Sequence, residues 1–142
     1  MSIEEIEQEI IEEFSNFEDW MDKYSYIIEI GNTCPIIEEK EKTENNLIKG
    51  CQSRVWVSAK LDERGLMQIT ADSDAVITKG IITPLLRVFN NQKPEDVYSA
   101  ELKFIDEIGL KSHLAPTRSN GLLSMIKQIK LYALAFGVKQ NQ

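Results

Sequence analysis

The sequence contains few of the residues that build metal frameworks and disulfide scaffolds. It has two cysteines, Cys34 and Cys51, one histidine, His113, and no CxxC pair. Structural zinc sites normally use four Cys or His ligands at set spacings, so a metal site here would need carboxylates to complete it. We also expect no structural disulfide, because the chain carries no sign of an oxidising compartment.

Other absences exclude further classes of protein. No apolar run approaches the roughly 20 residues of a membrane helix, and the acidic start MSIEEIEQEI lacks the basic region and apolar core of a signal peptide. The sequence contains neither a GxxxxGK[ST] nor a GxGxxG motif, so it does not predict a nucleotide cofactor. The net charge of −7, without a basic cluster, argues against nucleic acid and anionic lipid as partners. We therefore expect a cytoplasmic protein.

What the sequence does contain fits one globular domain. The chain has 142 residues, of which 42% are hydrophobic and 27% are charged. These values are ordinary for a globular protein with a single core. Because no internal repeat or linker divides the chain, we predict one domain over residues 1–142.

The first third of the sequence predicts two helices. Ser2 and Glu5 have the spacing of a capping box before a helix over residues 3–14. Asn16 is then expected to cap a second helix that ends near Gly31. Residues 34–46 are expected to be irregular.

The middle of the chain predicts a β-hairpin. Residues 54–61 are rich in β-branched and aromatic side chains, residues 62–65 have turn composition, and residues 66–72 alternate between apolar and polar. Residues 47–49 are a candidate for a short third strand. Since a hairpin alone is marginally stable, helices must cover one of its faces.

The rest of the chain is expected to be largely helical. Asp72, Ser73 and Asp74 are expected to cap a helix that extends to about residue 89, and Pro84 should kink or break that helix. Short helices are predicted from Pro94 and over residues 102–108, then a loop over 113–121 and a final helix over 122–136. The predicted fold class is α+β, with a small antiparallel two- to three-stranded sheet covered by helices.

Cys51 is the strongest candidate for chemistry. Gly50 before it permits a sharp turn, and the polar Gln52 and Ser53 suit a loop. From the residues alone, the alternatives are a reactive thiol and a small buried hydrophobic residue. A hydrolase nucleophile would also need a base, for which His113 is the one candidate.

Other candidates have simpler explanations. Cys34, before Pro35 at a helix end, is interpreted as a structural thiol. Helix capping explains Asp72 and Asp74, although an exposed acidic helix start could also contact a partner. Arg118 is interpreted as a solvated arginine in a polar loop.

Several motifs resemble one known family. Gly50-Cys51-Gln52-Ser53, followed by Val55-Trp56-Val57, resembles the signature of the SufE family of sulfur-acceptor proteins. The resemblance continues with the N-terminal Trp20, Lys23-Tyr24 and Gly31, and then with Asp72-Ser73-Asp74-Ala75, Lys79-Gly80, His113-Leu114, Pro116, Arg118-Ser119 and Gly121-Leu122. It therefore extends over nearly the whole chain.

The resemblance implies a function in iron–sulfur cluster assembly. Proteins of this family take persulfide sulfur from a cysteine desulfurase (SufS-like), which they also stimulate, and deliver it to an iron–sulfur scaffold complex (SufBCD-like). They are carriers and activators rather than stand-alone enzymes. The pyridoxal phosphate belongs to the desulfurase, and no cofactor or metal of the carrier itself is implied. The implied fold is similar to that of the iron–sulfur scaffold proteins.

The resemblance also implies roles for individual residues. Cys51 matches the sulfur-accepting cysteine, and Gly50, Gln52 and Ser53 match the loop that holds it, with Gly50 as an expected hinge. Two further positions, Asp74 and Arg118, are expected to face the partner. Cys34 is outside the family pattern, so it could compete for sulfur or form a disulfide.

Two alternatives stay open within this interpretation. The chain could be a regulator that only docks on a desulfurase, with a structural Cys51. It could also be an iron–sulfur scaffold, although scaffolds typically use three cysteines with a carboxylate or histidine. The sequence leaves open which desulfurase is the partner, which branch of the family this is, and the oligomeric state.

Overall fold

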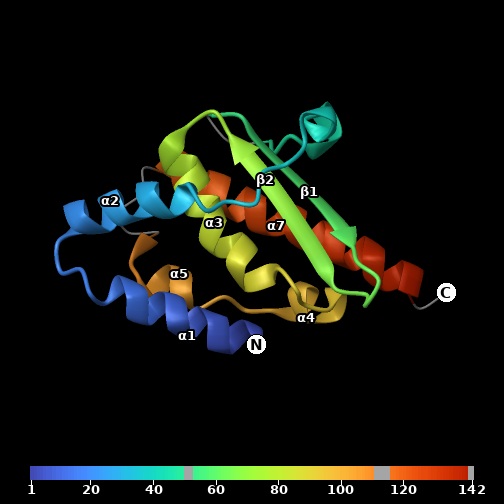
Figure 1. Cartoon of the computed structure of the whole chain (residues 1–142), viewed down its shortest axis with the longest axis horizontal. Coiled ribbons are helices and arrows are strands. Elements are labelled where there is room, and N and C mark those ends of the chain that lie inside the picture. Colours follow the sequence, from blue (N-terminus) through green and yellow to red (C-terminus); the bar gives the residue numbers. More distant parts are fainter. Residues whose placement is uncertain (50–52, 111–115, 141–142) are drawn as a thin grey trace.

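A computed structural model describes residues 1–49, 53–110 and 116–140, with only the backbone for 116–119 and 138–140. The fold is α+β, as predicted (Figure 1). In chain order the helices and strands are α1 (Ile3–Phe14), α2 (Trp20–Gly31), β1 (Val55–Leu61), β2 (Met67–Ser73), α3 (Val76–Phe89), α4 (Pro94–Ser99), α5 (Phe104–Glu107) and α7 (Pro116–Gln140). Short 3₁₀ turns occupy Glu39–Glu41 and Glu44–Asn46.

The two strands form the predicted antiparallel hairpin, in a register that runs from Val55 opposite Ser73 to Leu61 opposite Met67. Side chains alternate between the two faces of a strand. Val57 and Ala71 therefore share one face, and both are completely buried. The hairpin turn contains Gly65, whose φ of 77° favours glycine.

No third strand forms within the described residues. Leu47 makes a single isolated bridge to Trp56 on the outer edge of β1, so the prediction of a strand over 47–49 is wrong. On the free edge of β2, the Asn90 side chain bonds both backbone groups of Ile69, at 2.6 and 3.2 Å. Ile36 makes a parallel bridge to Ala71 on the same edge. These contacts satisfy backbone N–H and C=O groups on the edge of β2 that could otherwise pair with another strand.

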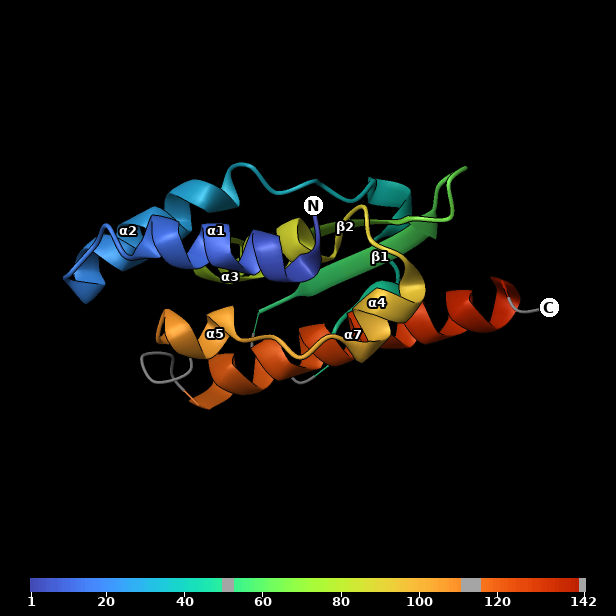
Figure 2. The same cartoon turned by 90° about the horizontal axis from the view of Figure 1, so that it is seen from below.

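The helices and the hairpin form two layers (Figure 2). One layer contains the hairpin with α1, α2 and α3, and the other contains α7 with α4 and α5. The hydrophobic core lies between them. Its largest fully buried side chains include Phe89, Phe104, Met67, Leu86 and Leu122.

The start of helix α2 differs from the prediction. The N-cap is Asp19, whose carboxylate accepts the Met21 N–H at 3.1 Å, and Asn16 is not the cap. Asn16 instead belongs to the end of α1, since its N–H donates to the Glu13 carbonyl. The local sequence offers two capping residues, and the path of the chain between the helices selects the later one.

Helix α3 also begins differently. Its N-cap is Ala75, without a side-chain cap, so the predicted capping by Asp72 and Asp74 is wrong. Both carboxylates make other contacts, described below. The helix continues through Pro84 as one element, and the Thr83 hydroxyl donates to the Lys79 carbonyl at 2.7 Å in the turn before the proline.

Helix α7 begins at Pro116, so the predicted loop over 113–121 is wrong from that residue onward. Proline is favoured in the first turn of a helix, where its missing N–H has no intrahelical partner to lose. The predicted apolar stripe is confirmed at Leu122, Met125, Ile129 and Ala133, which are at most 2% exposed. Among the described residues, no helix has the length and apolarity needed to cross a membrane.

Candidate functional site

Residues 50–53, which include Cys51, are called the cysteine segment below. The junction of β1 and α3 holds one end of this segment. The hydroxyl of Ser53 lies 3.0 Å from that of Thr78 in α3, and Asp74 Oδ1 accepts the backbone N–H of Arg54 at 2.9 Å. The Asp74 N–H donates in return to the Arg54 carbonyl at 3.2 Å. Ser53, predicted to belong to the cysteine loop, is therefore fixed to the first turn of α3.

The other end of the segment is fixed to the same hairpin. Ile48 is 5% exposed, and its N–H donates to the Val55 carbonyl at 2.8 Å. The residues before and after the cysteine segment therefore both bond to the hairpin near the start of β1. Gly50, Cys51 and Gln52, predicted to carry and hold the reactive thiol, lie between these points and outside the described residues.

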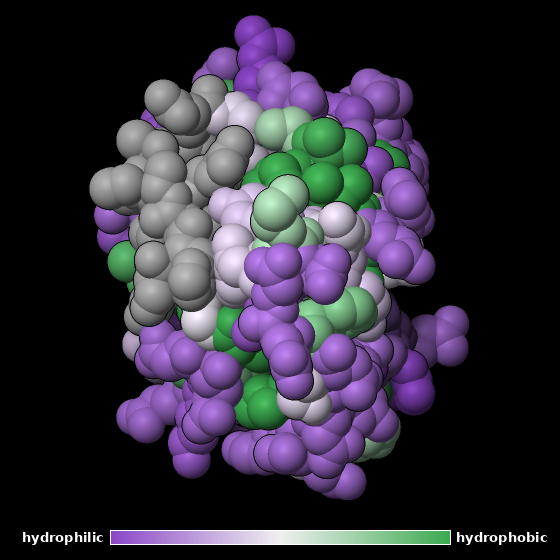
Figure 3. All heavy atoms as spheres, turned by 90° about the vertical axis from the view of Figure 1, so that its left-hand side faces the viewer, coloured by the Kyte–Doolittle hydropathy of each residue, from purple (hydrophilic) through white to green (hydrophobic). Residues whose placement is uncertain are grey.

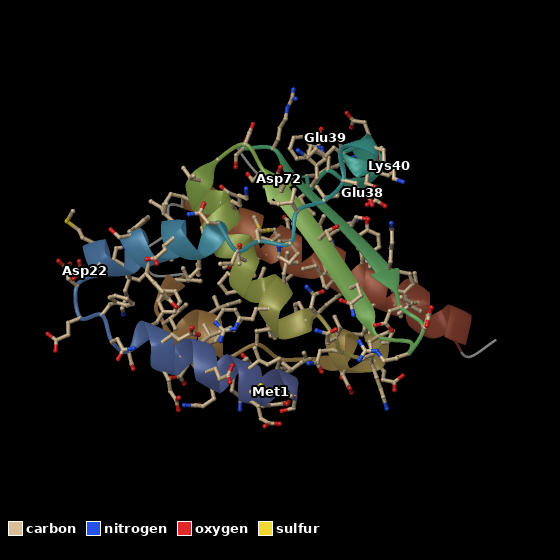
Figure 4. The ribbon with its side chains drawn as sticks, viewed as in Figure 1. Met1, Asp22, Glu38, Glu39, Lys40 and Asp72 are labelled. Atoms are coloured by element: carbon tan, nitrogen blue, oxygen red, sulfur yellow. The ribbon has the colours of Figure 1, made fainter. Side chains whose placement is uncertain are left out.

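A partly buried charge cluster, formed by Asp72, Lys42 and Lys79, lies beside this junction. Asp72 Oδ2 is 2.8 Å from Lys42 Nζ, and Asp72 Oδ1 is 3.5 Å from Lys79 Nζ. Lys42 also lies 5.2 Å from the centroid of the Trp56 ring, in a cation–π contact. In Figure 4, Asp72 lies on the same side of the hairpin as the turn that carries Lys40.

Burial acts to raise the pKa of Asp72, but two hydrogen bonds and two positive charges outweigh it. The bonds come from Lys42 and from the Ser73 N–H, and the charges are those of Lys42 and Lys79, so the pKa lies below its usual value. Asp72 is therefore ionised at neutral pH. It connects the irregular segment 34–46 to β2 and to α3, rather than capping α3 as predicted.

Asp74 is exposed and lies at the surface beside the cysteine segment. Its bond to Arg54 is a structural role that the sequence did not predict. Arg118 lies two residues after the start of α7, in a helix rather than in the predicted loop, and its side chain is outside the described residues. His113, the base required by the hydrolase alternative, is also outside them.

The second cysteine is part of the hydrophobic core. Cys34 is 6% exposed, and its Sγ lies 3.7 Å from the carbonyl oxygens of Pro35 and Ala71. Burial raises the pKa of the Cys34 thiol, against smaller lowering effects of the Thr83 hydrogen bond and the Lys79 charge. A buried protonated thiol is a poor nucleophile.

Exposed hydrophobic side chains occur on the neighbouring helices. Met21 and Ile28 in α2 are 75% and 39% exposed, and Val76 at the start of α3 is 64% exposed. Figure 3 faces this end of the molecule and shows hydrophobic residues exposed among hydrophilic ones. No contact among these three side chains is described, so each counts as a single exposed apolar residue.

The residues that form this site come from distant parts of the sequence. The sequence around Thr78 and Lys42 did not predict that either residue belongs to the site. A threonine inside a helix and a lysine in a polar segment have many ordinary roles. The pairing of Lys42 with Asp72 spans 30 residues, and that of Ser53 with Thr78 spans 25. Only the packing of the 34–46 segment and α3 around the hairpin brings them together.

The described residues contain no group of three or more His, Cys, Asp or Glu side chains that could hold a metal ion. The features that the site does present are a thiol-bearing segment fixed at both ends, a shielded ion cluster and exposed apolar side chains.

Comparison with known proteins agrees with the motifs. A solution structure of a hypothetical protein from Thermus thermophilus is 17% identical, with a TM-score of 0.77 over 94% of this chain and 96% of that one. This similarity shows a shared fold. The sequence model of the SufE family, described as an Fe–S metabolism associated domain, matches residues 8–133. The chain therefore belongs to the SufE family.

Proposed function

We propose that this protein accepts sulfur from the persulfide of a cysteine desulfurase onto Cys51. In this proposal it also stimulates the desulfurase and delivers the sulfur to an iron–sulfur cluster scaffold, in the reducing cytoplasm. The observation that carries the proposal is the GCQS motif in a segment whose two ends are bonded to the hairpin and α3, in a chain of a family associated with Fe–S metabolism.

The transfer needs one thiolate and no cofactor of the carrier. The Cys51 thiolate attacks the terminal sulfur of the desulfurase persulfide, and a new S–S bond forms at Cys51. The S–S bond within the desulfurase breaks, and its cysteine leaves as a thiolate. The Cys51 proton is lost before the attack and the leaving thiolate can take one up, so no net oxidation or reduction occurs.

The two cysteines differ in their suitability for this step. Cys34 is enclosed by the core, and its raised pKa keeps it protonated. Cys51 follows a glycine in the sequence, between the exposed Lys49 and Arg54. Positive charges near a thiol favour the thiolate. This contrast supports Cys51 as the acceptor and makes Cys34 an unsuitable competitor.

Asp74 and Arg118 are proposed to face the desulfurase. Asp74 is exposed beside the cysteine segment, and one of its oxygens already holds Arg54. The exposed Val76, two residues after Asp74, would add apolar contact area beside it. Such a surface would exclude water from the persulfide during transfer.

The experiment that tests the proposal is intact-protein mass spectrometry under non-reducing conditions. The protein, C51S and C34S are each incubated with a family-matched cysteine desulfurase and free cysteine. We expect a gain of one sulfur atom that reductant removes, that persists in C34S and that is absent in C51S. No gain in the unaltered protein, together with intact stimulation by C51S, would instead indicate a docking regulator.

A further inference from the structure

A groove lies between residues 44–49 and helix α7, and the proposed sulfur transfer does not use it. Its volume is about 400 Å³. Leu47 and Ile48 line one wall, Leu131 lines the other, and Lys49 and Lys127 stand on opposite walls. Leu131 is 49% exposed, which is high for a leucine in a helix that otherwise contributes to the core.

The walls of the groove are held in place by bonds between its two sides. The Tyr132 hydroxyl in α7 bonds the Val57 carbonyl at 3.2 Å and also the Asn46 side chain. Asn46 in turn donates to the Glu41 carbonyl at 2.7 Å. The groove is therefore formed before any partner arrives, which lowers the ordering cost of binding.

The charge of this groove differs from that of the rest of the protein. Among the described residues, neither Lys49 nor Lys127 forms an ion pair, and the one carboxylate in the lining is Glu44. Three other hollows on the described residues have more carboxylates than basic groups in their linings. In a chain with a net charge of −7, a groove with two lysines that form no ion pair within the described part of the chain is therefore distinctive.

We propose that this groove docks an acidic segment of the cysteine desulfurase, with an apolar side chain of that segment against Leu47 and Leu131. The inference rests on the proposed function, because it names a second contact for the same partner. Lys49 directly precedes the cysteine segment in the sequence, so a partner segment bound here would lie next to the residue at which the cysteine segment begins. Free inorganic anions would use the lysines but leave Leu47 and Leu131 without a role.

Lysine suits this task because its ammonium group is a point charge on a flexible stem, which can follow a carboxylate in a mobile peptide. Charges of opposite sign across an interface chiefly steer association and select the partner. The groove would therefore contribute affinity and specificity, while Cys51 performs the chemistry.

The test compares two charge reversals that change the net charge equally. K127E alters the groove, while K93E alters an exposed lysine at the start of α4. Dissociation constants for a family-matched desulfurase are measured by isothermal titration calorimetry at low salt and at roughly 0.5 M salt, where charges are screened within a few ångströms. We expect K127E to weaken binding roughly tenfold at low salt, with a much smaller effect at high salt. K93E should change it less than about twofold.

A second pair of variants tests the apolar wall. L131S should weaken binding, and L134S, a similarly exposed leucine of α7 outside the groove lining, should not.

Equal effects of K127E and K93E, or no effect of either, would overturn the proposal. Loading of Cys51 is measured separately at saturating desulfurase. Normal loading of K127E with weakened binding supports the groove, whereas absent loading in the unaltered protein contradicts the proposed function and not the docking.

Discussion

At the scale of single residues, a few carboxylates fix the geometry around the hairpin. Asp62 accepts the backbone N–H groups of Arg64 and Leu66 and the side chains of Arg64 and Gln68. The Leu66 N–H is the largest of the effects that lower its pKa, from 3.8 to about 2. The sequence predicted a turn over these residues, but not that one side chain would organise it.

Asp62 should make stability depend on pH in the acid range. Its folded pKa lies below its unfolded pKa, so the stabilisation is fully present above about pH 4 and is lost as the pH falls towards 2. We expect D62N to unfold at lower urea concentration than the unaltered protein at pH 7. The difference between the two free energies of unfolding should shrink as the pH is lowered from about 4.5 to about 3. A difference that is independent of pH would show that the charge of Asp62 is unimportant.

At the scale of secondary-structure elements, α2 and α3 pack at two glycines. A Cβ atom added to Gly80 would lie 2.2 Å from the backbone oxygen of Ile27, and one added to Gly31 would lie 3.1 Å from the Gly80 nitrogen. The two helix backbones therefore approach closely at this point. This contact lies in the same part of α3 as Thr78 and Lys79, which contact Ser53 and Asp72.

Replacing Gly80 by alanine should force these helices apart. Backbone cannot yield as a flexible side chain does, so we expect G80A to lower the free energy of unfolding by about 1–3 kcal/mol. G137A is the matched control, because the added Cβ at Gly137 meets nothing within 4 Å. It should be neutral or stabilise the helix by up to about 1 kcal/mol. Urea denaturation followed by circular dichroism measures both, and equal stabilities of the two variants would contradict the close contact.

The elements themselves were largely predictable from sequence, because capping, periodicity and turn composition act within a few residues. The capping box of α1, the hairpin and the apolar stripe of α7 are confirmed. The errors occur where several residues could serve the same local role. Asn16 and Asp19 both suit an N-cap, and Pro116 suits either a loop or the first turn of a helix.

At the scale of the whole molecule, buried polar side chains connect distant parts of the chain. Glu7 in α1 is 4% exposed, and its Oε2 accepts the N–H groups of Lys103 at 2.6 Å and Phe104 at 3.0 Å. The N-terminal helix is thereby bonded to the start of α5, nearly a hundred residues later. No sequence pattern distinguished Glu7 from the other glutamates of α1.

Removing this connection should destabilise the fold. We expect E7A to lose about 1–3 kcal/mol of unfolding free energy, because the buried N–H of Phe104 and the partly buried N–H of Lys103 lose their acceptor. E12A, an exposed glutamate of the same helix, should change stability by no more than about 0.5 kcal/mol. Thermal and urea denaturation of both variants provide the measurement. Similar stabilities would mean that water replaces the Glu7 carboxylate at no cost.

The sequence by itself determined the α+β class, the hairpin and the family, because these depend on alternation, turn chemistry and motifs that lie close together along the chain. It also singled out Cys51 and its neighbours. Only the tertiary structure decided that Asp72 pairs with Lys42 and Lys79, that Asp74 holds Arg54, that Cys34 is enclosed by the core and that a basic groove forms beside α7. The physical reason is that ion pairs, burial and grooves depend on which distant segments pack together, and local sequence does not encode that packing.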